Sequence, residues 1–458
     1  MTPSAPMACS RPSALYQIGL ALAGVAMVIL PCIYVALTAL AVYGVFYFAT
    51  ECFVPIWDWH VGHSKWAFLA KFICSVTPLL VGSAIAFFMV KPLFARRGAR
   101  MQPLVLDPAV EPRVYGLVQE VCTAVGAPAP RRVELNCDLN ASASFDRGLR
   151  GFLGNQLILT LGMPLVAGLT HRELAGVIAH EFGHFRQGAG MRFSYVIRRV
   201  NGWFARVVYE RDAWDEAIAS WSESEEGWIT VMVRCAQLGV WFSRRVLWVL
   251  MMAGHAISCL LLRQMEYDAD RAEIRLAGST AFESTTMKMA ALGDVLSTIH
   301  HEMGRVWRRQ MQLPDNLPVL LEYRAARLAP EARAKVENEV IVSKTGLFDT
   351  HPSAADRVRR AAKLAEPGAE ISDAPARELF ENFDTLSRLV TLAHYEDDLN
   401  VPTSAEFLIP LEQLIRSKSE SAPARAEAAA PPPPPAVRKL RYDPSAFQGR
   451  GTGGANGP

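Results

Sequence analysis

The sequence predicts a mainly helical α+β protein, in which a transmembrane helical hairpin precedes a domain with a small β-sheet. Three observations support this fold class. Two long apolar runs occupy the first 92 residues, short strand-like segments follow between residues 132 and 161, and helical spacing of apolar residues dominates the remainder. With 458 residues, 51% of them hydrophobic, the chain can form a large core and also present apolar surface to lipid.

The first apolar run has no charged residue between Arg11 and Glu51. About 20 apolar residues suffice for a helix to cross the hydrocarbon core, so this run is longer than one span requires. Pro31 lies near its middle and allows either one kinked helix or two short passes. We favour one pass, because no polar residues surround Pro31 to form a turn at the far surface.

The second apolar run extends from Trp66 to Val90, with Lys71 near its start, where a lysine can extend to the interface. Tryptophans between the two runs are typical of a membrane interface. The residues after the second run are basic: Lys91, Arg96, Arg97 and Arg100. The positive-inside rule therefore predicts a multi-pass protein of the inner (plasma) membrane, with most of the chain in the cytoplasm.

The segments after Met101 predict the start of a soluble domain. Residues 111–125 have helical spacing and end at Gly126, and residues 132–136, 140–145 and 156–161 are expected to be strands. The net charge of +2 indicates neither a nucleic-acid binder nor an acidic-ligand binder. The eight cysteines contain no CxxC pair, so a disulfide framework or a cysteine zinc cluster is not expected.

The sequence LAGVIAHEFGHFRQ, residues 174–187, predicts a metal site on a helix. His180 and His184 are four residues apart and therefore lie on one helical face, where both imidazoles can reach one zinc ion. Glu181 is placed to take a proton from a water on that ion. Thr170 and Glu173 form a capping box that starts this helix.

A third metal ligand is expected further along the chain, because catalytic zinc takes three protein ligands and one water. Glu266 and Asp270 are four residues apart and face the same way on a helix. Glu266 can bind the metal while Asp270 accepts a hydrogen bond from a ligand histidine.

The remaining segments complete the predicted organisation. Arginines interrupt the apolar stretch 228–262, which leaves three alternatives: an amphipathic helix, a re-entrant element, or one span after Arg245. Residues 375–399 are expected to form one helix. The predicted parts are an N-terminal tail (1–13), a transmembrane hairpin (14–92), a main domain (93–370) that includes this apolar or amphipathic insertion, a C-terminal helical segment (371–416) and a disordered Pro/Ala/Gly-rich tail (417–458).

Four motifs resemble the membrane zinc metalloendopeptidases that include HtpX and the CAAX-prenyl protease, a gluzincin-type family. They are NASASF from Asn140, LAGVIAHEFGHF from Leu174, EYDAD from Glu266 and DTHPSAADRV from Asp349. The resemblance implies a zincin-like protease domain between about residues 130 and 360. Two features depart from the family pattern: three arginines lie within 228–262, and an acidic, aromatic insertion occupies 212–228.

The resemblance also implies roles for residues that spacing alone does not identify. His351 or Arg357 would contact substrate or stabilise a developing oxyanion. Asn140, Ala141 and Ser142 would form a strand beside the cleft, with which a substrate peptide pairs.

These observations together predict a membrane-anchored metalloendopeptidase that holds one Zn²⁺ per chain through His180, His184 and Glu266. It would hydrolyse peptide bonds by a zinc-activated water with Glu181 as general base, and its expected partners are the bilayer and membrane-associated protein or peptide substrates, as in membrane-protein quality control. No nucleic acid is expected, and oligomeric state and cleavage preference stay open. The alternative is a non-catalytic membrane scaffold that binds zinc for structure.

Overall fold

The structure is a computed structural model that describes residues 14–58, 64–94, 103–146, 156–185, 189–209, 227–399, 401 and 403–414. The chain divides into two compact units. The helical unit comprises Ser13–Ala99 and Arg192–Leu261, and the sheet unit comprises Met1–Pro12, Arg100–Met191 and Leu262–Pro458. The predicted N-terminal tail, residues 147–155 between the second and third predicted strands, most of the acidic insertion and the C-terminal tail lie outside the described residues.

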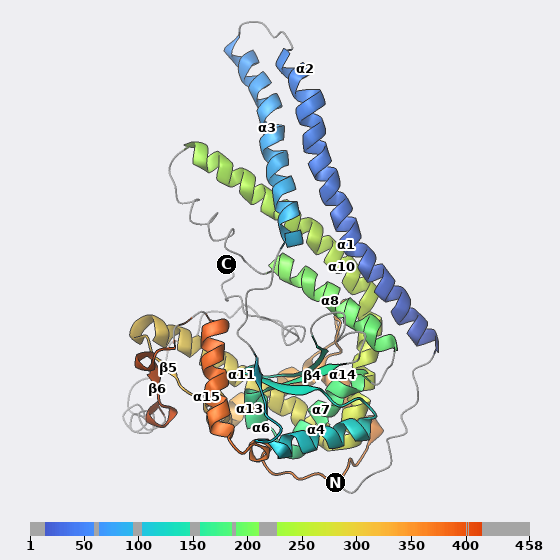
Figure 1. Cartoon of the computed structure of the whole chain (residues 1–458), viewed down its shortest axis with the longest axis vertical. Coiled ribbons are helices and arrows are strands. Elements are labelled where there is room, and N and C mark those ends of the chain that lie inside the picture. The colour runs from blue at the N-terminus through green and yellow to red at the C-terminus, as the bar shows by residue number, and fades with distance from the viewer. Residues whose placement is uncertain are drawn as a thin grey trace. The chain divides into compact units, whose positions relative to one another are not determined.

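The helical unit begins with one unbroken helix, α1 (Ala14–Tyr47), which contains Pro31. The expected single helix is therefore confirmed over the first apolar run. A π-helical segment, η1 (Phe48–Cys52), and α2 (Phe53–Asp58) continue it. The second run forms α3 (Lys65–Val90) and ends in the 3₁₀ turn η2 (Lys91–Phe94), and α1 and α3 pack along each other (Figure 1).

Two further helices enter the helical unit. They are α8 (Ala189–Tyr209) and α10 (Gly227–Ala277), a continuous helix of 51 residues whose last part belongs to the sheet unit. No turn interrupts α10, which excludes the re-entrant alternative for 228–262 and leaves the amphipathic helix and the span after Arg245. Among the described residues, three helices are long and apolar enough to cross a membrane: Tyr16–Asp58, Lys65–Phe94 and Thr230–Ala277.

A buried tyrosine joins three helices of the helical unit. The Tyr34 hydroxyl of α1 donates to the Met89 carbonyl of α3 at 2.8 Å and lies 3.2 Å from the Ser243 hydroxyl of α10. Ser243 in turn donates to the Phe88 carbonyl at 2.8 Å. These bonds satisfy hydroxyl groups that burial in an apolar bundle would otherwise leave unpaired.

The sheet unit contains the predicted strands as β2 (Arg132–Asn136), β3 (Ala141–Phe145) and β4 (Leu157–Gly162), joined by the short β1 (Leu104–Val105). The sheet order is β1-β2-β4-β3. β2 and β4 are parallel, whereas β1 and β3 pair antiparallel at the two edges. The three predicted strands are confirmed, and β3 is an edge strand among the described residues.

Two helices, α6 (Met163–Gly168) and α7 (His171–Phe185), pack against this sheet, and α4 (Pro112–Val125) packs on α7 (Figure 1). The expected stop of α4 is confirmed, because Gly126 adopts a φ of 76° that favours glycine. The capping box of α7 is also confirmed: Thr170 N donates to Glu173 Oε2 at 2.9 Å, and Glu173 N donates to Thr170 Oγ1 at 3.3 Å. The start of α7, the helix that carries His180 and His184, is therefore determined by hydrogen bonds between residues three apart in the sequence.

The C-terminal half of the sheet unit is largely helical. Its elements are α11 (Ser279–Gln310), β5 (Leu313–Pro314), α12 (Leu317–Ala325), α13 (Pro330–Val342), α14 (Ala354–Leu364), η3 (Ala376–Leu379), α15 (Phe383–Asp397), η4 (Ala405–Phe407) and β6 (Leu408–Ile409). β5 and β6 pair in parallel as a separate two-stranded sheet.

The prediction of one helix over 375–399 is wrong at its start. The α-helix begins only at Phe383, and a 3₁₀ turn precedes it. The buried Glu111 carboxylate accepts hydrogen bonds from the backbone N–H groups of Glu381 and Asn382. These tertiary bonds stabilise a separate N-terminus at this point, which local sequence patterns do not reveal.

Candidate metal centre

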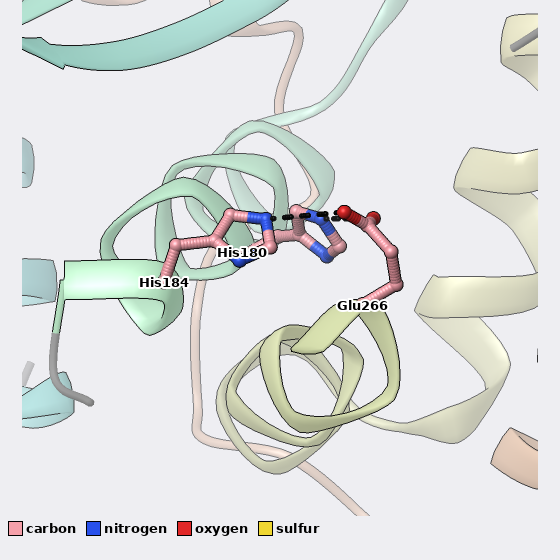
Figure 2. A group of neighbouring side chains, drawn as sticks. All are labelled: His180, His184 and Glu266. Atoms are coloured by element: carbon pink, nitrogen blue, oxygen red, sulfur yellow. Dashed lines mark ion pairs between the residues drawn. The ribbon is translucent and has the colours of Figure 1, made fainter. Parts of the chain in front are cut away.

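The two motif histidines and Glu266 converge in the sheet unit (Figure 2). His180 and His184 lie one turn apart on α7, and both side chains point toward Glu266 on α10. The Nε2 atoms of His180 and His184 lie 3.5 and 3.7 Å from the two carboxylate oxygens of Glu266. All three residues are buried.

The donor set fits a zinc ion. The three ligand atoms lie within 4.8 Å of one another. Two ligands at ~2.1 Å from a tetrahedral ion are roughly 3.4 Å apart, which agrees with the His180–Glu266 and His184–Glu266 separations above. Two imidazole nitrogens and one carboxylate oxygen are also the ligand types of a catalytic zinc site.

Glycines on α7 bring the two ligand-bearing helices together. A Cβ added at Gly183 would lie 3.1 Å from the Ala269 Cα of α10, and one at Gly176 would lie 2.9 Å from the Ala277 Cβ. Gly176 and Gly183 are seven residues apart and therefore share one face of α7. This close approach allows the Glu266 side chain to reach both histidines. The seven-residue spacing of the two glycines is the signal in the sequence that could have indicated the close packing of the two helices.

Asp270 contacts the face of His180 opposite Glu266. Its Oδ1 lies 3.1 Å from His180 Nδ1, and Glu273 Oε2 lies 3.5 Å from the same nitrogen. A proton on Nδ1 would bond to these carboxylates and leave the Nε2 lone pair directed at Glu266 and the metal position. Sequence reasoning identified Asp270 but missed Glu273.

His351 and Arg357 are both brought to this cluster, at different places. His351 Nδ1 lies 3.3 Å from Glu266 Oε1, directly beside the ligand set. Arg357 of α14 instead forms a bidentate pair with Asp270, with Nη2–Oδ1 and Nε–Oδ2 distances of 2.5 and 3.0 Å. Arg357 is therefore linked to the ligand His180 through Asp270.

Charge in the cluster is balanced by buried partners. Burial by itself lowers the pKa of His180, but the nearby carboxylates of Asp270, Glu266 and Glu273 outweigh it and raise that pKa well above its ordinary value of 6.5. Burial likewise lowers the pKa of Arg357, but the Asp270 charge raises it above its ordinary value. Arg357 therefore stays charged and neutralises Asp270.

Glu181 faces the edge of the sheet. Its half-buried side chain accepts a hydrogen bond from the backbone N–H of Ala143 on β3, with a distance of 3.2 Å from Oε2. The motif carboxylate therefore lies at the outer edge of β3, immediately next to His180 in the chain.

The backbone of β3 alternates between its partner strand and the open edge. Asn140 O accepts from Gly162 N, and Asp146 N donates to Gln156 O, so even-numbered residues bond toward β4. Ala141, Ala143 and Phe145 consequently direct their N–H and C=O groups to the other edge. Of the predicted substrate strand, Ala141 fits that role, whereas Asn140 and Ser142 bond toward β4. Ala143 was missed, although the alternation of a strand could have indicated it.

Comparison with known proteins gives one family and several bacterial relatives. A family model described as Peptidase family M48 matches residues 108–365. A Bacteroides fragilis protein called "Protease HtpX homolog" is 22% identical over 347 residues, which cover 73% of this chain and 93% of the relative. An Acinetobacter baumannii "Protease HtpX" is 27% identical over 215 residues, covering 45% and 58%. No solved structure matches significantly.

Proposed function

Because the chain belongs to peptidase family M48 and is a membrane metalloprotease, we propose that it is a zinc-dependent endopeptidase. The observation that carries this proposal is the convergence of His180, His184 and Glu266 from two helices. Their donor atoms have the chemistry and the spacing that one Zn²⁺ requires. A bound zinc ion would supply a Lewis acid that polarises the scissile carbonyl and makes water at the site more acidic.

Glu181 is the proposed general base. Its carboxylate is adjacent to a ligand histidine and reaches the N–H of Ala143 at the open edge of β3. A peptide bound along that edge would bring its scissile carbonyl next to this carboxylate. Glu181 would take the proton of the attacking water and return it to the leaving amine.

His351 is the proposed substrate-facing group. Its imidazole lies beside Glu266, and its side chain is 14% exposed to solvent. His351 therefore borders the ligand set at a position that a substrate can reach. A donor at this position would stabilise negative charge that develops on the substrate carbonyl.

Asp270 and Arg357 are proposed as positioning residues. Asp270 fixes the tautomer and the ring orientation of His180, and Arg357 holds Asp270 in its charged state through two hydrogen bonds.

The substrate is proposed to add a strand to β3. Among the described residues β3 pairs only with β4, so the outward N–H and C=O of Ala141 and the outward C=O of Ala143 can pair with an extended peptide, while the Ala143 N–H donates to Glu181. Backbone pairing recognises any extended segment, which suits a protease for unfolded portions of membrane proteins. We place the enzyme in the inner (plasma) membrane with its metal centre in the cytoplasm, because basic residues follow the first helical pair.

The test is cleavage of casein by the full-length protein in detergent, with and without Glu181→Gln. We expect a loss of about 10²- to 10⁴-fold in kcat with zinc content retained, because the ligands are untouched. Glu120→Gln, on the exposed surface of α4, is the matched control and should cleave normally. Unchanged cleavage by Glu181→Gln would contradict the assignment of the base.

Orientation needs a separate experiment. Added protease should digest the C-terminal tail in inside-out membrane vesicles and spare it in intact cells. The opposite pattern would overturn the cytoplasmic placement while leaving the chemistry unaffected.

A further inference from the structure

A cavity of about 390 Å³ lies in the helical unit between α8 and α10, apart from the metal ligands in sequence. Its volume falls in the range typical of small-molecule sites. Apolar and aromatic side chains form most of its lining, and two guanidinium groups add positive charge. The lining residues are Val208, Gln237, Val240, Trp241, Arg244, Arg245 and Trp248.

Arg245 is held in this cavity by two tryptophan rings. Its guanidinium carbon lies 5.7 Å from the ring centroid of Trp241 and 5.5 Å from that of Trp248. The three residues are four and three positions apart and so share one face of α10. Both distances are within the range of cation–π attraction, which orients the guanidinium but leaves its hydrogen-bond donors available.

The charge of this site is unusual for its setting. Arg244 and Arg245 interrupt the apolar stretch of a helix that is long and apolar enough to cross a membrane. Exposed Leu238, Phe242 and Val249 flank them. Arginine is costly in the hydrocarbon core and is accommodated where its guanidinium reaches the interface or a bound partner.

The position of Arg245 along α10 matches the headgroup level of a bilayer. Ser243 donates to the Phe88 carbonyl at 2.8 Å, and Phe88 lies three residues before Lys91, where the second apolar run ends and the basic segment begins. Arg245 follows Ser243 by two residues on α10 and therefore lies near the membrane interface that Lys91 marks. Trp and Arg are both favoured at such an interface.

We propose that this cavity binds the phosphate headgroup of an anionic phospholipid such as phosphatidylglycerol. The guanidinium of Arg245 matches phosphate oxygens in a bidentate manner, and Arg244 lines the same cavity as a second positive charge. The tryptophan rings and Val240 would contact the glycerol and the upper acyl chains. The two arginines favour a lipid with net negative charge over one whose phosphate is neutralised by its own ammonium group.

The test is native mass spectrometry of the full-length, delipidated protein, titrated with phosphatidylglycerol and separately with phosphatidylcholine. We expect preferential binding of phosphatidylglycerol. Arg245→Met should weaken it roughly tenfold to a hundredfold, because a charge-assisted pair is lost. Trp248→Leu leaves the charge in place and should weaken it less. Arg234→Met is the matched control on the same helix, since Arg234 is exposed and does not line the cavity.

The outcomes that overturn the proposal are distinct. Equal binding of the two lipids, or undiminished phosphatidylglycerol binding by Arg245→Met, would exclude a headgroup site here. An equal loss in Arg234→Met would show only general attraction to surface charge. Complete displacement of phosphatidylglycerol by millimolar inorganic phosphate would identify a site for free anions and exclude a lipid site. Thermal melting of each variant at the wild-type temperature establishes that its fold is retained.

Discussion

Replacing Arg357 by methionine tests whether the Asp270 pair supports the metal centre. The change leaves the Asp270 carboxylate buried, with a side chain 3% exposed, and removes its bidentate partner. Breaking a fully buried pair from one side costs about 3–5 kcal/mol. Because the Arg357 side chain is 28% exposed, water can compensate in part, and we expect a loss of about 2–3 kcal/mol in the free energy of unfolding.

The same change should reduce zinc affinity, because Asp270 orients the ligand His180 from its Nδ1 side. Loss of support for a ligand typically lowers metal affinity by about 10- to 100-fold. The assay is zinc retention in detergent against a competing chelator, measured together with urea unfolding of the full-length protein.

Arg359→Met is the matched control for this prediction. Arg359 lies on the same helix, α14, and pairs with Asp356, but its side chain is 62% exposed. An exposed pair contributes at most about 1 kcal/mol, so this variant should keep its zinc affinity. Equal behaviour of the two variants would refute the positioning role of Arg357. Adding Asp270→Asn to Arg357→Met should recover part of the lost stability, because no unpaired buried charge then remains.

Three further predictions concern the sheet and the core. Gly162→Ala should destabilise the fold by at least about 2 kcal/mol in urea unfolding, because its Cβ would lie 1.7 Å from the Asp138 carbonyl oxygen; wild-type stability would contradict this. Burial raises the pKa of Cys122 from 9.0 to about 12, so its contribution to stability is complete below pH 9 and is lost as the pH rises toward 12. Iodoacetamide at pH 8 should therefore modify Cys122 only in unfolded protein, as peptide mapping would show. Ala141→Pro removes an outward N–H at the first residue of β3, where an edge strand tolerates proline, and leaves the Ala143–Glu181 hydrogen bond in place. Peptide kcat/KM should fall about tenfold with the melting temperature retained; unchanged cleavage would exclude strand pairing at this edge.

Much of the fold was predictable because its signals are local. The capping box at Thr170 and Glu173 starts α7 through bonds between residues three apart. The three strands β2, β3 and β4 follow from alternation and turn residues, and α1 and α3 follow from uninterrupted apolar length. The late start of α15 was not predictable, because Glu111 stabilises it from 270 residues away.

The sequence by itself determined the chemistry available to this protein: two imidazoles and a carboxylate on one turn of helix, a second acidic pair downstream, and apolar helices that precede them. Only the tertiary structure decided how these groups combine. Two glycines on α7 bring α10 close enough for Glu266 to face both histidines, Arg357 binds Asp270, and Ala143 meets Glu181 at the open edge of β3. The physical reason is that helical and strand periods fix which residues share a face, whereas the partner of that face depends on packing between segments distant in the chain.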